Sequence, residues 1–517
     1  MLAAAVLFFC YWRQSSAAAL PSDGSGNVLQ AWDMLHGNLL LHNWWVSDVS
    51  FYTTELPQYM LIEALTGLGP WVVHAAAAMT YTLLVLLAAM LARGHAPPRE
   101  GNARALLAAG LMLAPQLSAT SILLLSADHT GTAVPLLAIW LLIDRDPETR
   151  PRWFVPVLVG LAFALVMVAD SIVLLTGIIP LALVCVLRAG AGLIRRGKRN
   201  ASWRYELALA GAAGAAGAAG EFVPRLMTAL GGYHQSPVEA NTDLSQLQHG
   251  SWVTFQAFLE LFGGNVFGAS FFGARPVLEV VFVALHLVGA ITVACALGLA
   301  FARFFRAGEL MAPVFAVAVV LNLGAYMSST HAQDLYGTRE MAEVLPLGAV
   351  LAGRVLGGRI PVWIRAAKGW SVPVLAVLTA SYLATLGYGA AQASAPAENE
   401  PLASWLVGDG LTDGLATYWQ ANSTTVDSHS QVRLSAVVQD VRDRLVPYLW
   451  ETDVANYDPA RRYANFVVAD GPSALPGMQL SADLTFGRPA RTYHADGYTI
   501  LVWNTNLLDK LNGPGLK

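Results

Sequence analysis

Long apolar segments, separated by short polar loops, determine what this chain can fold into. A helix needs about 20 apolar residues to cross the hydrocarbon core of a bilayer. Segments of this kind lie at residues 2–20, 71–92, 103–126, 131–143, 153–169, 171–187, 205–228, 277–302, 310–327, 342–356 and 371–391. Residues 103–143 and 153–187 are each too long for one crossing, so each is predicted to form a hairpin. With a mean hydropathy of +0.49, the sequence predicts a mainly α fold, a polytopic membrane helix bundle of about 11 spans.

Basic residues are distributed unevenly among the loops between these segments. Lysine and arginine are frequent in alternate loops, at residues 93–104, 145–152, 188–204, 303–306 and 354–368. The intervening loops hold only Arg225, Arg275 and Arg339. The positive-inside rule then predicts a multi-pass plasma-membrane protein with a cytoplasmic N-terminus and with everything after Ala391 outside. The net charge of −4 gives no support for a nucleic-acid partner.

The composition changes after Ala391, where mixed polar and apolar residues replace the long apolar runs. Residues 432–438, 464–468 and 498–502 have the β-branched pattern of strands, and residues 439–449 have the pattern of an amphipathic helix. We therefore predict two domains. Residues 1–391 form the transmembrane domain, with a first outer loop at 21–70, and residues 392–517 form a small extracytoplasmic α/β domain.

The segment Pro21–Pro57 is an acidic island in this apolar chain, because it contains four acids and no lysine or arginine. Asp23 follows the first apolar segment almost at once. Gly24 and Gly26 leave the backbone free to turn there, and residues 27–35 are predicted to form a helix on the membrane surface. An acid at membrane depth costs about 2.5–3.5 kcal/mol on insertion scales, so Asp23 is expected to face water, a partner or a substrate. The alternative is that Asp23 caps the helix.

The opening loop also carries a spaced set of residues, Asp23, Ala31 and Gly37, in the pattern Asp-x7-Ala-x5-Gly. Together with the N-terminal helix, the many spans and the outer C-terminal domain, this pattern resembles the GT-C glycosyltransferases. The resemblance is to the protein O-mannosyltransferase and aminoarabinose transferase groups, which use polyprenyl-phosphate-linked sugars. It implies that Asp23 is the general base that deprotonates an acceptor hydroxyl. The chain departs from those groups where Gly24 replaces the second member of an acidic pair.

Further polar residues on the predicted outer side are candidates for binding. Asp48 and Glu55 are candidates for positioning the acceptor or for binding a metal, and the alternative is that both are solvated loop acids. Asp128 and His129 could bind a divalent metal, or a lipid phosphate through that metal, and the alternative is a capped turn. Arg339 is the candidate ligand of a donor phosphate, because a guanidinium matches phosphate bidentately. A helical pair of Arg339 with Glu343 is the alternative there.

These observations favour a membrane glycosyltransferase that transfers a sugar from a polyprenyl-phosphate-linked donor to an extracytoplasmic acceptor of the cell envelope. The acceptor would be a glycan, a lipid or a protein, and Mg²⁺ or Mn²⁺ is the candidate cofactor. Membrane lipids are the expected surroundings, and nucleic acid is not an expected partner. One alternative is a transporter or flippase of a lipid-linked substrate, which would favour symmetric repeats and charges at the membrane midplane. The other is an inactive GT-C-like scaffold.

Overall fold

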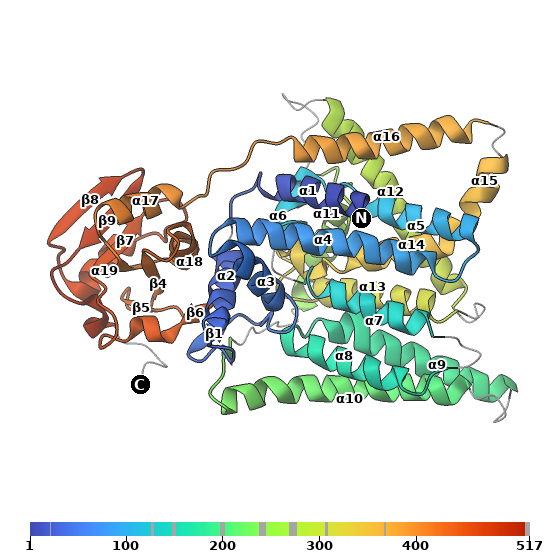
Figure 1. The fold of residues 1–517 in the computed structure, drawn as a ribbon, viewed down its shortest axis with the longest axis horizontal. Coiled ribbons are helices and arrows are strands. Elements are labelled where there is room, and N and C mark those ends of the chain that lie inside the picture. The colour runs from blue at the N-terminus through green and yellow to red at the C-terminus, as the bar shows by residue number, and fades with distance from the viewer. Residues whose placement is uncertain are drawn as a thin grey trace. The chain divides into compact units, whose positions relative to one another are not determined.

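The apolar segments of the sequence fold as helices in a computed structural model of the chain (Figure 1). The structure describes residues 1–20, 22–125, 129–146, 151–196, 202–236, 244–267, 277–304, 309–366 and 369–511. Every predicted span overlaps at least one helix. These helices are α1 (Leu2–Ser15), α4 (Trp71–Arg93), α5 (Pro98–Met112), α6 (Thr120–Leu123), α7 (Ala133–Asp144), α8 (Val155–Ala169), α9 (Ile179–Arg196), α10 (Ser202–Ala229), α12 (Val277–Ala302), α13 (Met311–Met327), α14 (Val344–Leu356) and α16 (Ser371–Ala390).

Several of these helices have the length and composition of membrane spans. Within the described ranges, 6 helices are long and apolar enough to cross a membrane, and the bent pair formed by α5 and residues 117–123 would make 7. The two parts of that pair are inclined at 79° to one another. The helices α7, α8 and α13 are apolar but shorter. The prediction of a mainly helical, polytopic membrane protein is therefore confirmed, and the number of 11 crossings stays a prediction.

The chain divides into two units. Unit 1 consists of Met1–Ser15, Ala77–Val223 and Glu239–Ala393, and unit 2 consists of Ser16–Ala76, Pro224–Val238 and Ser394–Lys517. Unit 2 therefore contains the opening loop as well as the C-terminal segment. The two-domain prediction divided the chain at residue 391 and assigned the opening loop to the membrane domain.

In unit 1, α14 is the most deeply buried helix and packs against α5, α12 and α13. Glycines allow this packing, since helices approach closely where side chains are small. A Cβ at Gly348 would lie 2.8 Å from Val293 of α12, and one at Gly353 would lie 2.8 Å from the carbonyl oxygen of Arg104 in α5. These contacts are too close for a larger residue, so the helix positions depend on both glycines.

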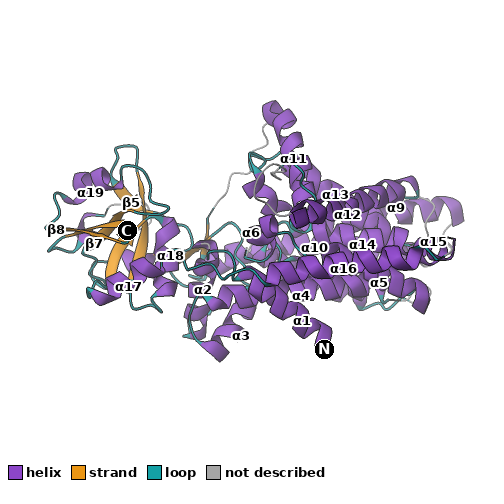
Figure 2. Cartoon of the chain, turned by 90° about the horizontal axis from the view of Figure 1, so that it is seen from above, coloured by secondary structure: helices purple, strands orange, loops and turns teal. Residues whose placement is uncertain are grey.

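Unit 2 contains a six-stranded mixed sheet of order β5-β4-β3-β7-β9-β8. Its strands are β3 (Asp413–Ala416), β4 (Arg433–Gln439), β5 (Leu445–Pro447), β7 (Phe466–Asp470), β8 (Arg491–Ala495) and β9 (Tyr498–Val502). Helices flank the sheet, namely α17 (Glu400–Gly408), α18 (Tyr418–Asp427) and α19 (Met478–Phe486) (Figure 2). Successive strand residues point to opposite faces. Phe466 thus packs in the core on the α17–α18 side, and Val467 packs in the core on the α19 side.

The predicted amphipathic helix at residues 439–449 is wrong, because this stretch forms the end of β4, a turn and β5. The Asp440 carboxylate accepts hydrogen bonds from the backbone N–H groups of Arg442 (2.8 Å) and Arg444 (2.9 Å). A short acidic side chain that binds the following backbone in this way stabilises a turn rather than a helix. The two strands then pair antiparallel, with Val437 opposite Pro447.

The opening loop is held by its own small sheet and helices within unit 2. Strand β1 (Trp44–Val46) pairs with β2 (His234–Gln235) and with β6 (Thr452–Asp453). Helix α2 runs from Ser22 to Leu35 and packs against α3 (Leu56–Thr66) and α18. The expectation that Gly24 and Gly26 form a turn is therefore wrong, since both glycines lie inside α2.

Candidate active site

Asp23, the residue singled out from the sequence, lies in a cluster of three oxygen-bearing side chains. It is the second residue of α2 and is partly buried. The Tyr418 hydroxyl lies 2.5 Å from Oδ1 of Asp23 and 2.9 Å from Oε2 of Glu451. Tyr418 is the first residue of α18, and Glu451 directly precedes β6. Unit 2 thus places one hydroxyl between two carboxyl groups, and 395 positions separate Tyr418 from Asp23 in the chain.

The number of hydrogens in this cluster determines how it is arranged. Each of the two oxygen–oxygen contacts requires one hydrogen, and the phenol supplies only one. Burial is the largest cause that raises the pKa of Tyr418 well above its ordinary value, so the phenol keeps its hydrogen. The second hydrogen must therefore sit on a carboxyl group. Glu451 is 1% exposed and is the more deeply buried of the two carboxyl groups.

The local backbone around Glu451 is built to bring its carboxyl group to this position. Glu451 has φ of 44°, in the left-handed region that non-glycine residues rarely adopt. Its carbonyl oxygen accepts a hydrogen bond from Nδ2 of Asn422 (3.0 Å). On the opposite side, a Cβ at Gly26 would collide with Oε2 of Glu451 and lie 2.9 Å from its Cδ. Gly26 is thus required because it leaves room for the Glu451 side chain beside α2.

A serine fixes the start of α18 against the start of α2. The Ser22 hydroxyl donates a hydrogen bond to the carbonyl oxygen of Tyr418 (2.6 Å). Ser22 and Asp23 are neighbours, so the same turn of α2 holds both the backbone and the hydroxyl of Tyr418. This double contact orients the Asp23 carboxylate.

The other acids of the opening loop have separate surroundings in unit 2. Oδ2 of Asp33 accepts hydrogen bonds from Nε1 of Trp44 (2.8 Å) and Nδ2 of Asn38 (2.6 Å), which gives Asp33 a structural role. The carbonyl oxygen of Asp48 accepts a hydrogen bond from the side chain of Gln235. Glu55 directly precedes α3, is 3% exposed and accepts a hydrogen bond from the adjacent Thr54 hydroxyl. Glu55 is therefore not the solvated acid of the alternative interpretation.

A buried acid that the sequence did not single out lies on α3. Glu63 is 2% exposed, and burial raises its pKa to about 9, so the carboxyl group is neutral at pH 7. A strongly shifted pKa is more frequent at functional sites than elsewhere. An acid inside an otherwise apolar helix would have been its only signal in the sequence.

A second polar cluster lies in unit 1 and contains the predicted binding residue His129. Its Nδ1 is 2.7 Å from Oδ2 of Asp170, and its Nε2 is 3.0 Å from Oε2 of Glu340. Thr132 donates to the same oxygen of Asp170 (2.7 Å). The cluster joins the residues before α7, the residues after α8 and the 3-10 helix η5 (Leu335–Met341). It holds these three segments together.

The electrostatics of this second cluster favour a charged imidazole ring. Burial alone lowers the pKa of His129, but the charge and hydrogen bond of Asp170, supported by Glu340, raise it well above its ordinary value. Burial also raises the pKa of Glu340, but the hydrogen bond and charge of His129 outweigh this effect and lower it to about 2. The protonated ring donates from both nitrogens.

The metal prediction rested on Asp128 together with His129, and Asp128 lies outside the described residues. Among the residues that the structure does describe, no group of three His, Cys, Asp or Glu side chains is arranged to hold a metal ion. The metal site therefore stays a prediction, and no chemical step is derived through a metal.

Arg339, the predicted phosphate ligand, lies on η5 beside Glu340. Its guanidinium carbon is 4.4 Å from the centre of the Tyr336 ring, and Nη1 donates to the Tyr336 hydroxyl (3.1 Å). Nε lies 3.9 Å from Oε1 of Glu340. Glu340 thus connects Arg339 to the His129 cluster. These contacts with Tyr336 and Glu340 describe the immediate surroundings of Arg339.

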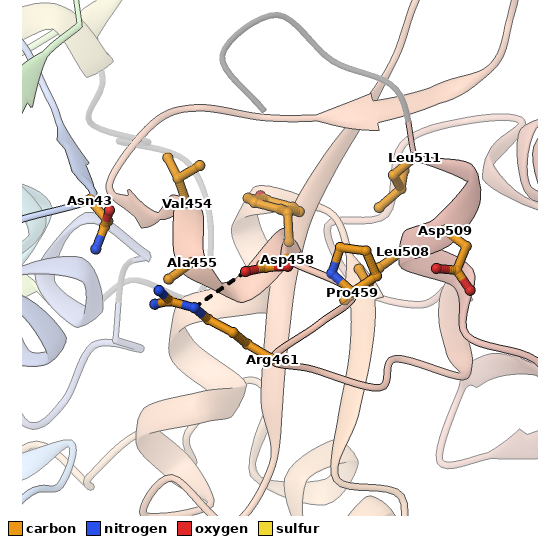
Figure 3. A pocket seen from close by; sticks show the side chains of 10 residues that line it. Asn43, Val454, Ala455, Asp458, Pro459, Arg461, Leu508, Asp509 and Leu511 are labelled. Atoms are coloured by element: carbon orange, nitrogen blue, oxygen red, sulfur yellow. Dashed lines mark ion pairs between the residues drawn. The ribbon is translucent and has the colours of Figure 1, made fainter. Parts of the chain in front are cut away.

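Unit 2 also contains a pocket of about 500 Å³ (Figure 3). It is lined by Asn43, Val454, Ala455, Tyr457, Asp458, Pro459, Arg461, Leu508, Asp509 and Leu511. Nε of Arg461 lies 3.2 Å from Oδ2 of Asp458 at its edge. The lining mixes carboxylates with apolar side chains, so it would suit a polar ligand with an apolar part.

The helical membrane unit and the mixed-sheet unit define the class as a polytopic, mainly helical membrane protein with a C-terminal mixed-sheet domain. The chain is similar to one solved structure of this class, the crystal structure of ArnT from Cupriavidus metallidurans bound to undecaprenyl phosphate. The TM-score is 0.54 at 13% sequence identity, and the similarity covers 99% of this chain and 98% of ArnT. No protein-family model and no curated protein matches the chain. The predicted resemblance to the aminoarabinose transferase group is thus confirmed at the level of the fold.

Proposed function

We propose that this protein is an integral-membrane glycosyltransferase that transfers a sugar from a polyprenyl-phosphate-linked donor to an extracytoplasmic acceptor of the cell envelope. The observation that carries the proposal is the cluster in which Tyr418 orients Asp23, with Glu451 behind it. Asp23 is also the residue to which the resemblance in the opening loop assigned the role of base. The ArnT-like fold supports a polyprenyl phosphate as the carrier of the sugar, since ArnT was solved with undecaprenyl phosphate.

In the proposed reaction, an acceptor hydroxyl attacks the anomeric carbon of the donor sugar. The bond from this carbon to the acceptor oxygen forms as the bond to the phosphate oxygen breaks, and the polyprenyl phosphate leaves with the electron pair. Asp23 takes the proton of the acceptor hydroxyl. Tyr418 holds the Asp23 carboxylate in one orientation, and neutral Glu451 donates to Tyr418, so Tyr418 donates only to Asp23. Arg339 is proposed to bind the donor phosphate.

Asp23→Asn and Tyr418→Phe test this assignment. Loss of a general base typically lowers the rate by about 10²–10⁴-fold, so Asp23→Asn is expected to abolish measurable transfer. Tyr418→Phe keeps the base but loses its orientation, and an intermediate loss is expected. Transfer is measured in membranes with a radiolabelled polyprenyl-phosphate sugar. Asp409→Asn, a charge change at an exposed position, is the control with expected full activity.

The same variants separate the proposal from its two alternatives. If the protein is a scaffold, expression of the Asp23→Asn variant in a deletion strain is expected to restore the wild-type glycan and lipid profile. If it is an enzyme, the profile of that strain is expected to stay as in the deletion. A transporter predicts movement of the lipid-linked sugar across the membrane without transfer to an acceptor. Full transfer activity of Asp23→Asn would overturn the proposed function.

A further inference from the structure

One face of α2 carries a stripe of polar and small residues. Asp23, Gly26, Asn27 and Gln30 follow one another at the spacing i, i+3, i+4, i+7, which places them on one side of a helix. This spacing normally belongs to the apolar face of a buried helix. In α2 the stripe instead begins at the candidate base and continues for two turns with amide side chains.

The two amides on this stripe are fully buried. Asn27 is 0% exposed and Gln30 is 1% exposed. Within the described part of the chain, neither the oxygen nor the nitrogen of either amide has a hydrogen-bond partner. Buried polar groups in proteins are almost always hydrogen-bonded, so these four atoms require a partner that is not part of the described protein.

The chemistry of the stripe selects the kind of partner. An amide offers two N–H donors and one acceptor oxygen, which matches a hydroxyl group that both donates and accepts. A phosphate would need cations, but residues 21–57 contain no lysine or arginine. The Asp23 carboxylate lies at the start of the stripe and would repel an anion. The partner is therefore neutral and rich in hydroxyl groups.

We propose that Asn27 and Gln30 form a sugar-binding subsite that holds the hydroxyl groups of the donor sugar on the face of α2 that carries Asp23. The inference rests on the proposed function for the identity of the donor. It assigns Asn27 and Gln30 the recognition of the sugar ring, and it leaves the lipid phosphate to other residues.

The test compares two ligands on the full-length protein in lipid nanodiscs. One is farnesyl phosphate, and the other is farnesyl phosphate that carries a neutral sugar, with mannosyl, glucosyl and arabinosyl forms. The wild type is expected to bind at least one sugar-bearing probe about tenfold or more tightly than the bare probe. Asn27→Leu and Gln30→Met are expected to lose this difference, with the Kd of the bare probe unchanged.

Thermal unfolding without ligand provides the second measurement. Both variants remove unpaired buried polar atoms, so their Tm is expected to equal or exceed that of the wild type. The matched control is Gln420→Met on α18, because Gln420 is equally buried but its amide is bonded to Pro472 (2.9 Å) and Thr417 (3.3 Å). The control is expected to show the opposite result, a lower Tm with both Kd values unchanged.

Three results would overturn the inference. They are an equal Kd of the wild type for bare and sugar-bearing probes, unchanged binding of sugar in both variants, and equal weakening of both probes. Amides bonded only to internal water would give unchanged binding with a raised Tm. The outcome is separate from that of the proposed function, since binding needs no transfer and Asp23→Asn is expected to keep the sugar-dependent Kd difference.

Discussion

Gly26→Ala is the smallest change that tests how the candidate active site is assembled. The substitution adds one methyl group to α2, and this group would collide with Oε2 of Glu451. It would also lie 2.9 Å from Cδ and 3.0 Å from Cβ of Glu451, so a movement of the carboxylate tip alone does not relieve the clash. The whole Glu451 side chain must therefore move away from α2, and its 2.9 Å hydrogen bond with Tyr418 is lost.

Two opposing terms determine the size of the effect on the free energy of unfolding. Alanine in place of glycine inside a helix stabilises by about 1 kcal/mol. Loss of a hydrogen bond in a charged cluster destabilises by about 1.5–3 kcal/mol. The expected net destabilisation is about 0.5–2 kcal/mol, which corresponds to a fall in Tm of roughly 1–8 °C for a unit of this size. Transfer activity is expected to fall with it, because Tyr418 loses its second partner.

A double-mutant cycle with Glu451→Ala decides whether this reasoning is correct. Without the Glu451 side chain the added methyl group has room, so Gly26→Ala is expected to become neutral or stabilising in that background. Gly408→Ala is the control, since a Cβ there meets nothing within 4 Å and no loss of stability is expected. An equal fall in Tm from Gly26→Ala with and without the Glu451 side chain would refute the argument.

Two further predictions concern unit 1. The raised pKa of His129 contributes stability that is fully present below pH 6.5, the ordinary pKa of histidine, and that is lost as the pH rises through the raised pKa. The lowered pKa of Glu340 contributes stability that is present above pH 4.5 and that is lost as the pH falls towards about 2. His129→Gln is therefore expected to lower Tm more at pH 6 than at pH 10, and an equal loss at both values would contradict the assigned charge. Arg354→Met is expected to lower the free energy of unfolding by about 3–5 kcal/mol, because the Arg354 side chain is 3% exposed and pairs with Asp144 at 2.6 Å. The added change Asp144→Asn removes the charge that Arg354→Met leaves unpaired, so it is expected to recover part of the lost Tm.

Apolar length alone predicted the helices, because a bilayer leaves few other conformations for such segments. The strands near residues 432–438 and 498–502 were predictable from β-branched residues. The sequence failed where a local contact decided the outcome, as in the turn that Asp440 forms after β4. It also failed at Gly26, which was interpreted as a turn residue although its role is to accommodate Glu451.

The partners of Asp23 could not be predicted, because nothing in the local sequence marks Tyr418 as different from an ordinary core tyrosine. The pairing of His129 with Asp170 was hidden in the same way, since 41 positions separate the two residues. The sequence had singled out only His129 of this pair, as a candidate for binding a metal or a lipid phosphate. The polar stripe of α2 was visible in the sequence as Asp23, Gly26, Asn27 and Gln30 at helical spacing. A search for apolar stripes alone passes over it.

The balance of hydrogens and acceptors gives the two clusters different roles. In unit 1, the protonated ring of His129 supplies one N–H to the carboxylate of Asp170 and one to that of Glu340, so each of these two acceptors has its own donor. Such a cluster is suited to hold segments together, and proton transfer would break it. In unit 2, one phenol contacts two carboxyl groups, so one of these carboxyl groups must hold the second hydrogen. With that hydrogen on Glu451, as proposed, Asp23 accepts the hydrogen bond of Tyr418 and is free of a proton of its own, which is the state that a general base requires.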